Sequence, residues 1–158
     1  MYRIPRDMRY SKNKTPYNPA FRAYLSPHKK DFLPLSYYIH ISHERCILET
    51  GAWPWETKQL NRLREYIAYN YEELDAICAE NGLMVFGEQL KRTPRGYDTD
   101  HPAAYWLRYK FWLTEYSFAP DDLRDLDVFA EAAGAAVRRF EPFRQFLMGA
   151  FDDRIYDE

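Results

Sequence analysis

The sequence has few cysteines and no long hydrophobic run. Its longest apolar stretches fall far short of the roughly 20 residues that a membrane span requires, and the first residues lack the apolar core of a secretory signal. Cys46 and Cys78 stand far apart without a C-x-x-C spacing, which argues against a disulfide framework. These absences predict a cytoplasmic protein with two reduced thiols and no membrane partner.

Common nucleotide-binding and hydrolase motifs are also absent. The patterns G-x-x-x-x-G-K-[ST], G-x-G-x-x-G, G-x-S-x-G and H-E-x-x-H do not occur. His40 and His43 are three residues apart, so on an extended strand they point to opposite faces and we expect no shared metal ion. The cofactor stays unknown, and the sequence leaves open whether the protein is an enzyme of an unfamiliar kind.

The chain length of 158 residues predicts one domain, covering residues 1–151, with a frayed tail at 152–158. Predicted strands gather early in the chain and predicted helices late, and no βαβ alternation is present. We therefore expect an α+β fold, with an antiparallel sheet of four to six strands and helices packed mainly on one face.

The apolar periodicity predicts where these elements lie. Strands are expected at residues 21–25, 36–41, 46–48 and 110–118, with a further one near residues 85–90. A helix should begin at Pro54, leaving Glu65 on its solvated face, and a second short helix should run from Tyr71 to Asn81. After Pro120, a long helix should bury a stripe from Leu126 to Phe140 and be kinked or interrupted at Pro142.

Charge is unevenly distributed. Residues 1–30 hold eight basic residues and one acid, whereas residues 119–158 hold ten acids and five basic residues. This asymmetry permits an anionic ligand at the N-terminal end, and it equally permits the two ends of the chain to neutralise each other.

A first polar motif occupies residues 3–17. Its arginines offer planar forks for phosphate or carboxylate and its lysines supply point charges, so the set is typical of an anion site. The expected ligand-binding residues are Arg3, Arg6, Arg9 and Lys14, with Asp7 and Tyr17 as candidate proton carriers. The alternative is an ion-pair network that ties this segment to acids elsewhere.

A second polar motif occupies residues 90–110 and has similar chemistry. Its expected ligand-binding residues are Arg92, Arg95, Tyr97, Asp100 and Lys110, and His101 is a candidate proton carrier. One hypothesis places both motifs in a shared cleft. In the alternative, residues 94–97 form a turn, Asp100 caps a short helix that opens at His101, and the charges are solvated.

The two motifs resemble the patterns of a known family. Residues 3–17 match R-x-x-R-D-x-R-[FY]-x-x-[DN]-K-x-x-Y, and residues 90–110 match L-K-R-x-P-x-G-Y-x-x-D-H-P followed by L-R-x-K. The chain thus resembles the bacterial and fungal domain of unknown function family 2461 over nearly its whole length. The resemblance supports the fold and supplies no reaction, cofactor or catalytic residue.

Two departures from this family carry expectations. Members usually begin with several dozen further, largely helical residues, whereas this chain starts almost at the first motif, as a fragment or shortened homologue would. The hairpin at residues 46–51 is also poorer in glycine than in relatives. Missing helical cover would expose sheet residues around Phe21, Tyr37 and Trp112 unless a partner or the chain's own C-terminal helix covers them. We expect self-association, for example as a homodimer, or marginal stability.

Two functions are compatible with these patterns. In the first, the protein binds, and in an enzyme acts on, an anionic small molecule that carries phosphate or carboxylate. In the second, it is a noncatalytic interaction module, with nucleic acid as one partner, in which basic residues contact phosphates and exposed tyrosines stack on bases.

Overall fold

The computed structural model describes residues 12, 17–25, 35–54 and 56–151 and shows an α+β fold. The strands form one antiparallel sheet in the order β1-β2-β3-β4, which confirms the predicted fold class. Their bounds are β1 Ala20–Leu25, β2 Tyr37–Ser42, β3 Cys46–Ala52 and β4 Trp112–Ser117. The predicted hairpin of residues 36–48 is present as β2 and β3.

Alternation of side chains sets the register of the sheet. Ile39 faces Leu48 across β2 and β3, and both pack in the hydrophobic core. The hairpin closes because the Ser42 backbone N–H donates to the Arg45 carbonyl at 2.9 Å. The Ser42 hydroxyl in turn accepts from the backbone N–H of Glu44 and of Arg45. A one-residue slip would move the apolar residues to the opposite face, so burial fixes this pairing.

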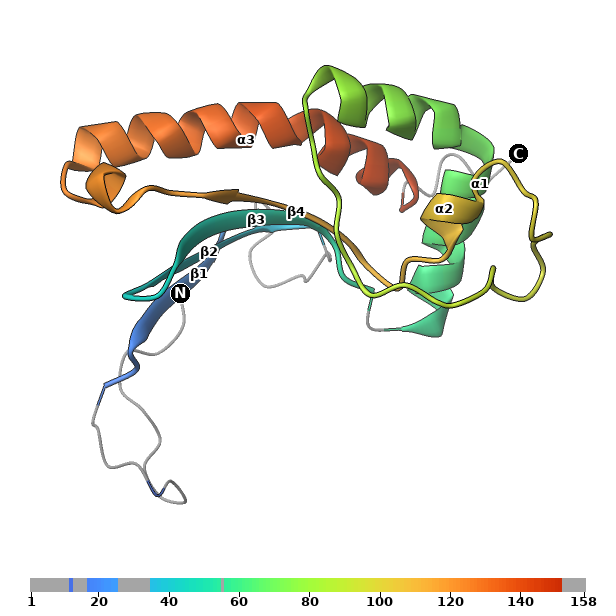
Figure 1. Cartoon of the computed structure of the whole chain (residues 1–158), viewed down its shortest axis with the longest axis horizontal. Coiled ribbons are helices and arrows are strands. Elements are labelled where there is room, and N and C mark those ends of the chain that lie inside the picture. The colour runs from blue at the N-terminus through green and yellow to red at the C-terminus, as the bar shows by residue number, and fades with distance from the viewer. Residues whose placement is uncertain (1–11, 13–16, 26–34, 55, 152–158) are drawn as a thin grey trace.

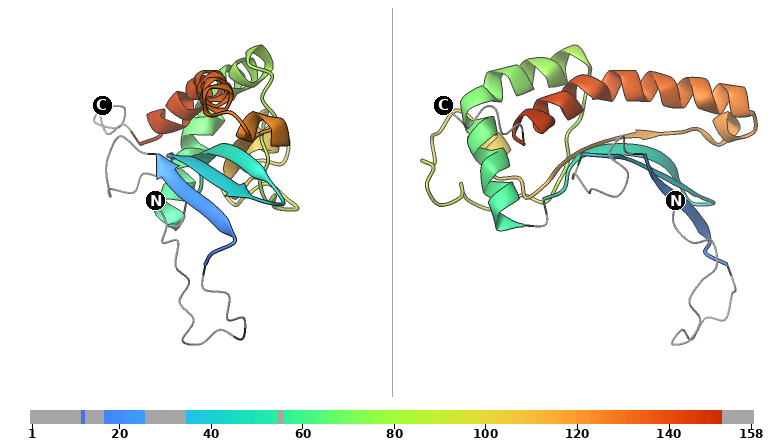
Figure 2. Two further views of the ribbon diagram at one scale, coloured as in Figure 1. Left: turned by 90° about the vertical axis from the view of Figure 1, so that its left-hand side faces the viewer. Right: turned by 180° about the vertical axis from the view of Figure 1, so that it is seen from behind.

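The helices form a second layer. Figure 1 shows α3 (Leu126–Gly149) lying across one face of the sheet, while α1 (Thr57–Glu80) stands at one end of it. The same arrangement appears from behind in Figure 2. The short α2 (Ala104–Leu107) lies beside α1, and the 3₁₀ helix η1 (Pro120–Leu123) precedes α3. The core between the layers contains Trp112, Phe140 and Leu147, all essentially inaccessible to solvent.

The helix after β3 differs from the prediction in where it begins and in its continuation past Asn70. It begins at Thr57, three residues later than expected, with Glu56 as its N-cap residue and Pro54 outside it. The two predicted helices are one, because the chain passes through a kink at Asn70 (φ −120°, ψ 23°) and continues. The Asn70 side-chain amide donates to the Tyr66 carbonyl at 2.8 Å, which supplies a partner for this carbonyl at the kink.

The expected burial stripe of α3 is wrong at its start. Leu126 is 79% exposed, and the buried residues lie in the second half of the helix, from Ala136 to Leu147. Pro142 does not interrupt the helix, which continues to Gly149. Proline removes one backbone donor, and Figure 1 shows the red C-terminal part of α3 sloping away from the direction of the orange part.

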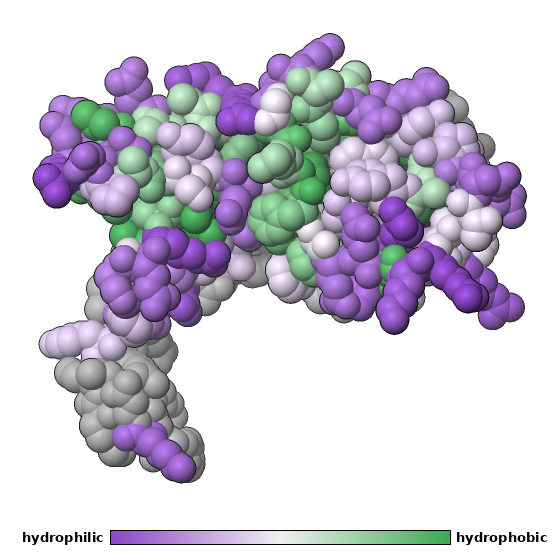
Figure 3. Space-filling view, in the orientation of Figure 1, coloured by the Kyte–Doolittle hydropathy of each residue, from purple (hydrophilic) through white to green (hydrophobic). Residues whose placement is uncertain are grey.

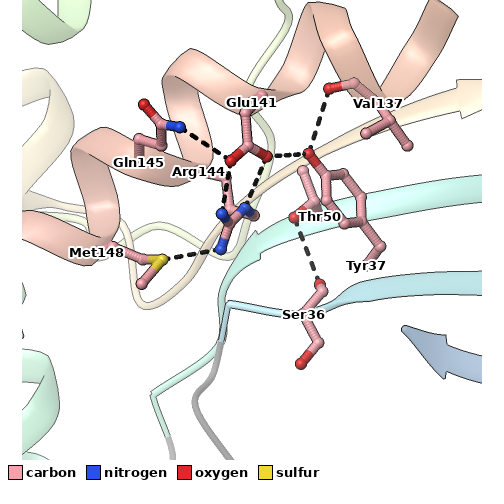
Figure 4. Close-up of polar contacts among 8 residues, drawn as sticks. All are labelled: Ser36, Tyr37, Thr50, Val137, Glu141, Arg144, Gln145 and Met148. Carbon is pink, nitrogen blue, oxygen red and sulfur yellow. Dashed lines mark hydrogen bonds and ion pairs between the residues drawn. The ribbon is translucent and has the colours of Figure 1, made fainter. Parts of the chain in front are cut away.

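A polar clamp fastens α3 to the sheet (Figure 4). Tyr37 on β2 donates its hydroxyl hydrogen to Glu141 Oε2 at 2.7 Å, and Arg144 grips both oxygens of the same carboxylate at 2.8 and 2.6 Å. The hydrogen bonds from Arg144 are the main reason that the pKa of Glu141 is lowered to about 2. Burial is the main reason that the pKa of Tyr37 is raised. The clamp keeps the carboxylate ionised and the phenol neutral.

Apolar residues gather between the helical layer and the sheet, and hydrophilic residues cover the end where α1 and α2 lie (Figure 3). Of the three sheet residues expected to lose cover, Trp112 is fully buried, Tyr37 is half-buried and Phe21 is 41% exposed. Self-association stays a prediction. Within the described residues, no helix is both long and apolar enough to cross a membrane.

Candidate functional site

Two paired arms hold the ends of the loop that carries the second motif. The first arm, residues 86–90, runs antiparallel to the second, residues 108–113. Phe86 and Leu113 exchange backbone hydrogen bonds of 2.8 and 3.0 Å, and the Leu90 N–H donates to the Arg108 carbonyl at 2.7 Å. The segment near residues 85–90, which was predicted to be a strand, instead pairs with the second arm through two isolated β-bridges. Residues 91–107, here called the site loop, extend from two fixed ends.

A glycine permits the close approach of the arms. A Cβ atom placed on Gly87 would lie 2.0 Å from the Phe111 carbonyl oxygen, a separation that no side chain tolerates. The neighbouring atom belongs to the backbone, so it cannot turn away as a flexible side chain would. Gly87 therefore fixes how tightly the site loop is closed at its base.

A buried arginine of α1 fastens the far end of the site loop. Arg64 is 7% exposed and donates from Nε to the Leu107 carbonyl and from Nη2 to the Tyr109 carbonyl, both at 3.1 Å. The Trp106 indole N–H donates to Asp75 Oδ1 at 2.8 Å, a second connection to α1. Arg64 thus supplies hydrogen-bond donors to two backbone carbonyls at the end of the site loop, which is a structural role.

The site loop lines two pockets. The first, here called the basic pocket, has a volume of about 350 Å³. Its lining residues are Lys91, Arg92, Thr93, Thr99, Ala104, Tyr105 and Arg108. Among the residues that the structure describes, its three cationic side chains form no ion pair, and Arg108 Nε is buried without a hydrogen-bond partner. Three cationic side chains without partner acids around one cavity make the pocket suited to an anion.

The second, here called the mixed pocket, lies on the α1 side of the site loop and has a volume of about 520 Å³. It is lined by Asn61, Glu65, Ala68, Tyr69, Arg95, Gly96, Tyr97, Asp98 and His101. Residues 94–97 form the predicted turn, with the Tyr97 N–H donating to the Pro94 carbonyl and Gly96 at φ 99°. The turn places charges of both signs around one cavity.

His101 is held in one tautomer when neutral. Its Nδ1 accepts a hydrogen bond from the Ala103 backbone N–H at 3.0 Å, so the proton of the neutral ring is on Nε2. The Tyr97 ring meets the imidazole edge-on, with ring centroids 5.9 Å apart. Burial raises the pKa of Tyr97, and the Glu65 carboxylate raises it further, so this phenol is a neutral hydrogen-bonding group at neutral pH.

Residues 1–146 match the model of the family described as conserved hypothetical protein (DUF2461). The chain belongs to this family. The match spans both motifs and every strand of the sheet. No curated protein and no solved structure matches the chain. The family description names no reaction or ligand, so the chemistry of the site rests on its geometry.

The residues expected from the second motif are divided between the pockets. Arg92 lines the basic pocket, whereas Arg95, Tyr97 and His101 line the mixed pocket. The other two expected residues line neither pocket. Asp100 is exposed and does not cap α2, whose N-cap is Ala103 without a side-chain cap. Lys110 forms an ion pair with Glu88 between the arms.

The first motif lies almost wholly outside the described residues. Arg3, Arg6, Asp7, Arg9 and Lys14 all lie outside them, so the shared cleft and the alternative ion-pair network are neither seen nor contradicted. Tyr17 is described, and its side chain is 65% exposed.

The two histidines considered for a metal have different surroundings. His40 is buried on β2, where its Nδ1 accepts from Arg22 Nε at 3.3 Å, whereas His43 is exposed in the hairpin turn beside Glu44. Burial, followed by Arg22 and Arg45, lowers the pKa of His40. No three metal-ligating side chains cluster within the part of the chain that the structure describes.

The sequence did not single out some of the pocket residues. Arg108 belongs to the L-R-x-K part of the second motif, and that position was its only signal. Glu65, which was expected on the solvated face of α1, is indeed exposed and also lines the mixed pocket. Its role depends on the site loop folding back over α1, which no local pattern encodes.

Proposed function

We propose that this protein binds an anionic small molecule, carrying phosphate or carboxylate, in the basic pocket. The observation that carries the proposal is the convergence of Lys91, Arg92 and Arg108 on one pocket, where none of them has an ion-pair partner within the described residues. Lys91 and Arg92 line the same pocket, so an anion would meet three cations and no carboxylate. Charge-assisted hydrogen bonds from arginine to phosphate are among the strongest that proteins make.

The hydroxyl groups around the cations support the same ligand class. Thr93 and Thr99 line the pocket and can donate to phosphate oxygens, whereas the Tyr105 hydroxyl donates to that of Tyr109 at 2.9 Å. None of the seven lining residues is a carboxylate or a histidine. The lining favours binding, and proton transfer would depend on residues such as His101 on the other side of the site loop.

The test is a titration of the protein with inorganic phosphate at low ionic strength, followed by NMR of the backbone amides. We expect shifts in the site loop and a decrease in affinity of about tenfold for Arg108→Gln, because one charge-assisted contact contributes about 1.5 kcal/mol or more. Arg124→Gln is the matched control, since Arg124 is an exposed arginine at the C-cap of η1, paired with Asp121. Equal binding by both variants would refute the proposal.

The second candidate is a nucleic-acid interaction module. It is favoured by Tyr105, which is 50% exposed beside the three cations and could stack on a base. An oligonucleotide would then bind more tightly than phosphate, and its affinity would fall steeply with added salt. Titration with a single-stranded hexanucleotide, wild type against Tyr105→Ala, distinguishes the two functions.

A further inference from the structure

The mixed pocket contains opposite charges that do not neutralise each other. Glu65 from α1 and Asp98 and Arg95 from the site loop line one cavity. Among the described residues, none of the three takes part in an ion pair, so no cation lies within 4.0 Å of either carboxylate. The nearby Arg64 forms no ion pair with them and instead donates to the Leu107 and Tyr109 carbonyls.

Aromatic surface completes the pocket. Tyr69 is 82% exposed, and the ring of Tyr97 is held against His101, so both can contact an apolar group of a ligand. Ala68 also lines the pocket and adds no charge. The cavity volume of about 520 Å³ falls in the range typical of small-molecule sites.

We infer that the mixed pocket binds a small zwitterion that carries one ammonium and one carboxylate group, the chemistry of a free amino acid. Arg95 offers a fork for the carboxylate, and Glu65 and Asp98 offer acceptors for the ammonium. The tyrosine rings would contact the side chain. The inference uses residues separate from those of the basic pocket and does not depend on the anion proposal.

The charges of the lining select this class over simpler ligands. A plain carboxylate would gain Arg95 but would lie close to the two acids, and a plain amine would gain the acids but lie close to Arg95. A zwitterion places each of its charges beside an opposite one, so it avoids the like-charge contact that each simpler ligand makes. Both of its charged groups should therefore contribute to affinity.

Three probes that share a phenyl ring and a short chain test this directly. They are L-phenylalanine, 3-phenylpropionate, which lacks the ammonium, and 2-phenylethylamine, which lacks the carboxylate. In NMR titrations we expect L-phenylalanine to bind at least tenfold more tightly than either, with amide shifts confined to the site loop and the first half of α1. Equal affinities, no binding, or shifts elsewhere in the protein would overturn the inference.

Substitutions assign each charge to its partner. Arg95→Gln should abolish the advantage of L-phenylalanine over 2-phenylethylamine, and Glu65→Gln combined with Asp98→Asn should abolish its advantage over 3-phenylpropionate. These three side chains are exposed, so the variants should fold, and far-UV circular dichroism verifies this. Arg124→Gln, which lies outside both pockets, is the matched control and should leave L-phenylalanine binding unchanged. An unchanged affinity ratio in the Arg95 variant contradicts the inference even if phosphate binding is confirmed.

Discussion

Tyr37 on β2 and Glu141 on α3 share a hydrogen bond of 2.7 Å between the phenol and the carboxylate. It joins the sheet to the helical layer at a point where Arg144 also binds both carboxylate oxygens. The glutamate thus connects Tyr37, which is 104 positions away in the sequence, to Arg144 on the next turn of its own helix.

This contact makes part of the stability depend on pH. Because the pKa of Glu141 is lowered to about 2, its contribution is fully present above the ordinary value of 4.5 and is lost as pH falls toward 2. We expect Glu141→Gln to lower the free energy of unfolding by about 1 kcal/mol at pH 7, with the difference shrinking below pH 4. Urea unfolding at pH 7, 5 and 3 measures it. Glu131→Gln, an exposed position on the same helix, should show no such trend.

Arg64→Met should destabilise the protein and loosen the site loop. The substitution leaves the Leu107 and Tyr109 carbonyls without their donors, at a cost of about 2 kcal/mol. Urea unfolding gives the magnitude, and amide hydrogen exchange should accelerate most at residues 103–109. Arg124→Met tests for a nonspecific effect of removing an arginine. Similar exchange patterns in both variants would show that Arg64 does not hold the loop.

Two carboxylates on neighbouring strands should repel each other. Glu49 and Glu115 face each other across β3 and β4, and the pKa of Glu49 is raised by burial and then by Glu115. The raised pKa means that the penalty is absent below about pH 4 and fully present above the raised value. Glu115→Gln should therefore increase the free energy of unfolding by about 0.5 kcal/mol at pH 7. A gain of the same size at pH 3 would argue against repulsion.

Two glycines should respond in opposite directions to alanine. Gly87→Ala forces a Cβ atom against the Phe111 carbonyl, so the paired arms must separate. We expect the free energy of unfolding to fall by more than about 2 kcal/mol and phosphate binding to be lost. Gly134→Ala, inside α3, meets only the flexible end of Arg138 at 3.4 Å and should stabilise the helix by about 0.5 to 1 kcal/mol. Thermal melting and the phosphate titration compare them. Equal melting temperatures would contradict the clash.

Local pattern was sufficient for the strands and for the turn at residues 94–97. Alternation from Phe21 to Leu25 predicted β1, and the Pro-Arg-Gly-Tyr sequence predicted the turn. Helix boundaries were harder to predict, because α1 begins three residues after Pro54 and continues through the kink at Asn70. Which residues of α3 are buried also depends on where the sheet ends beneath the helix, and this cannot be predicted from the sequence of α3 alone.

The candidate site was predicted in its composition and missed in its arrangement. Arg92, Arg95, Tyr97 and His101 do line pockets, but they are divided between two of them. The division follows from the path of the site loop around α1, a contact between residues about 30 positions apart. Asp100 and Lys110 have the same chemistry as the others, and only the fold distinguishes them as solvated or paired.

The sheet order has a consequence for the folding pathway. Short connections join β1 to β2 and β2 to β3. A much longer segment, which contains α1 and the site loop, separates β3 from β4. Closing so long a segment costs more chain entropy than forming a hairpin. We expect the β2–β3 hairpin to form early and the β3–β4 ladder to form late. The pockets, which lie within the intervening segment, would then be assembled among the last parts of the molecule.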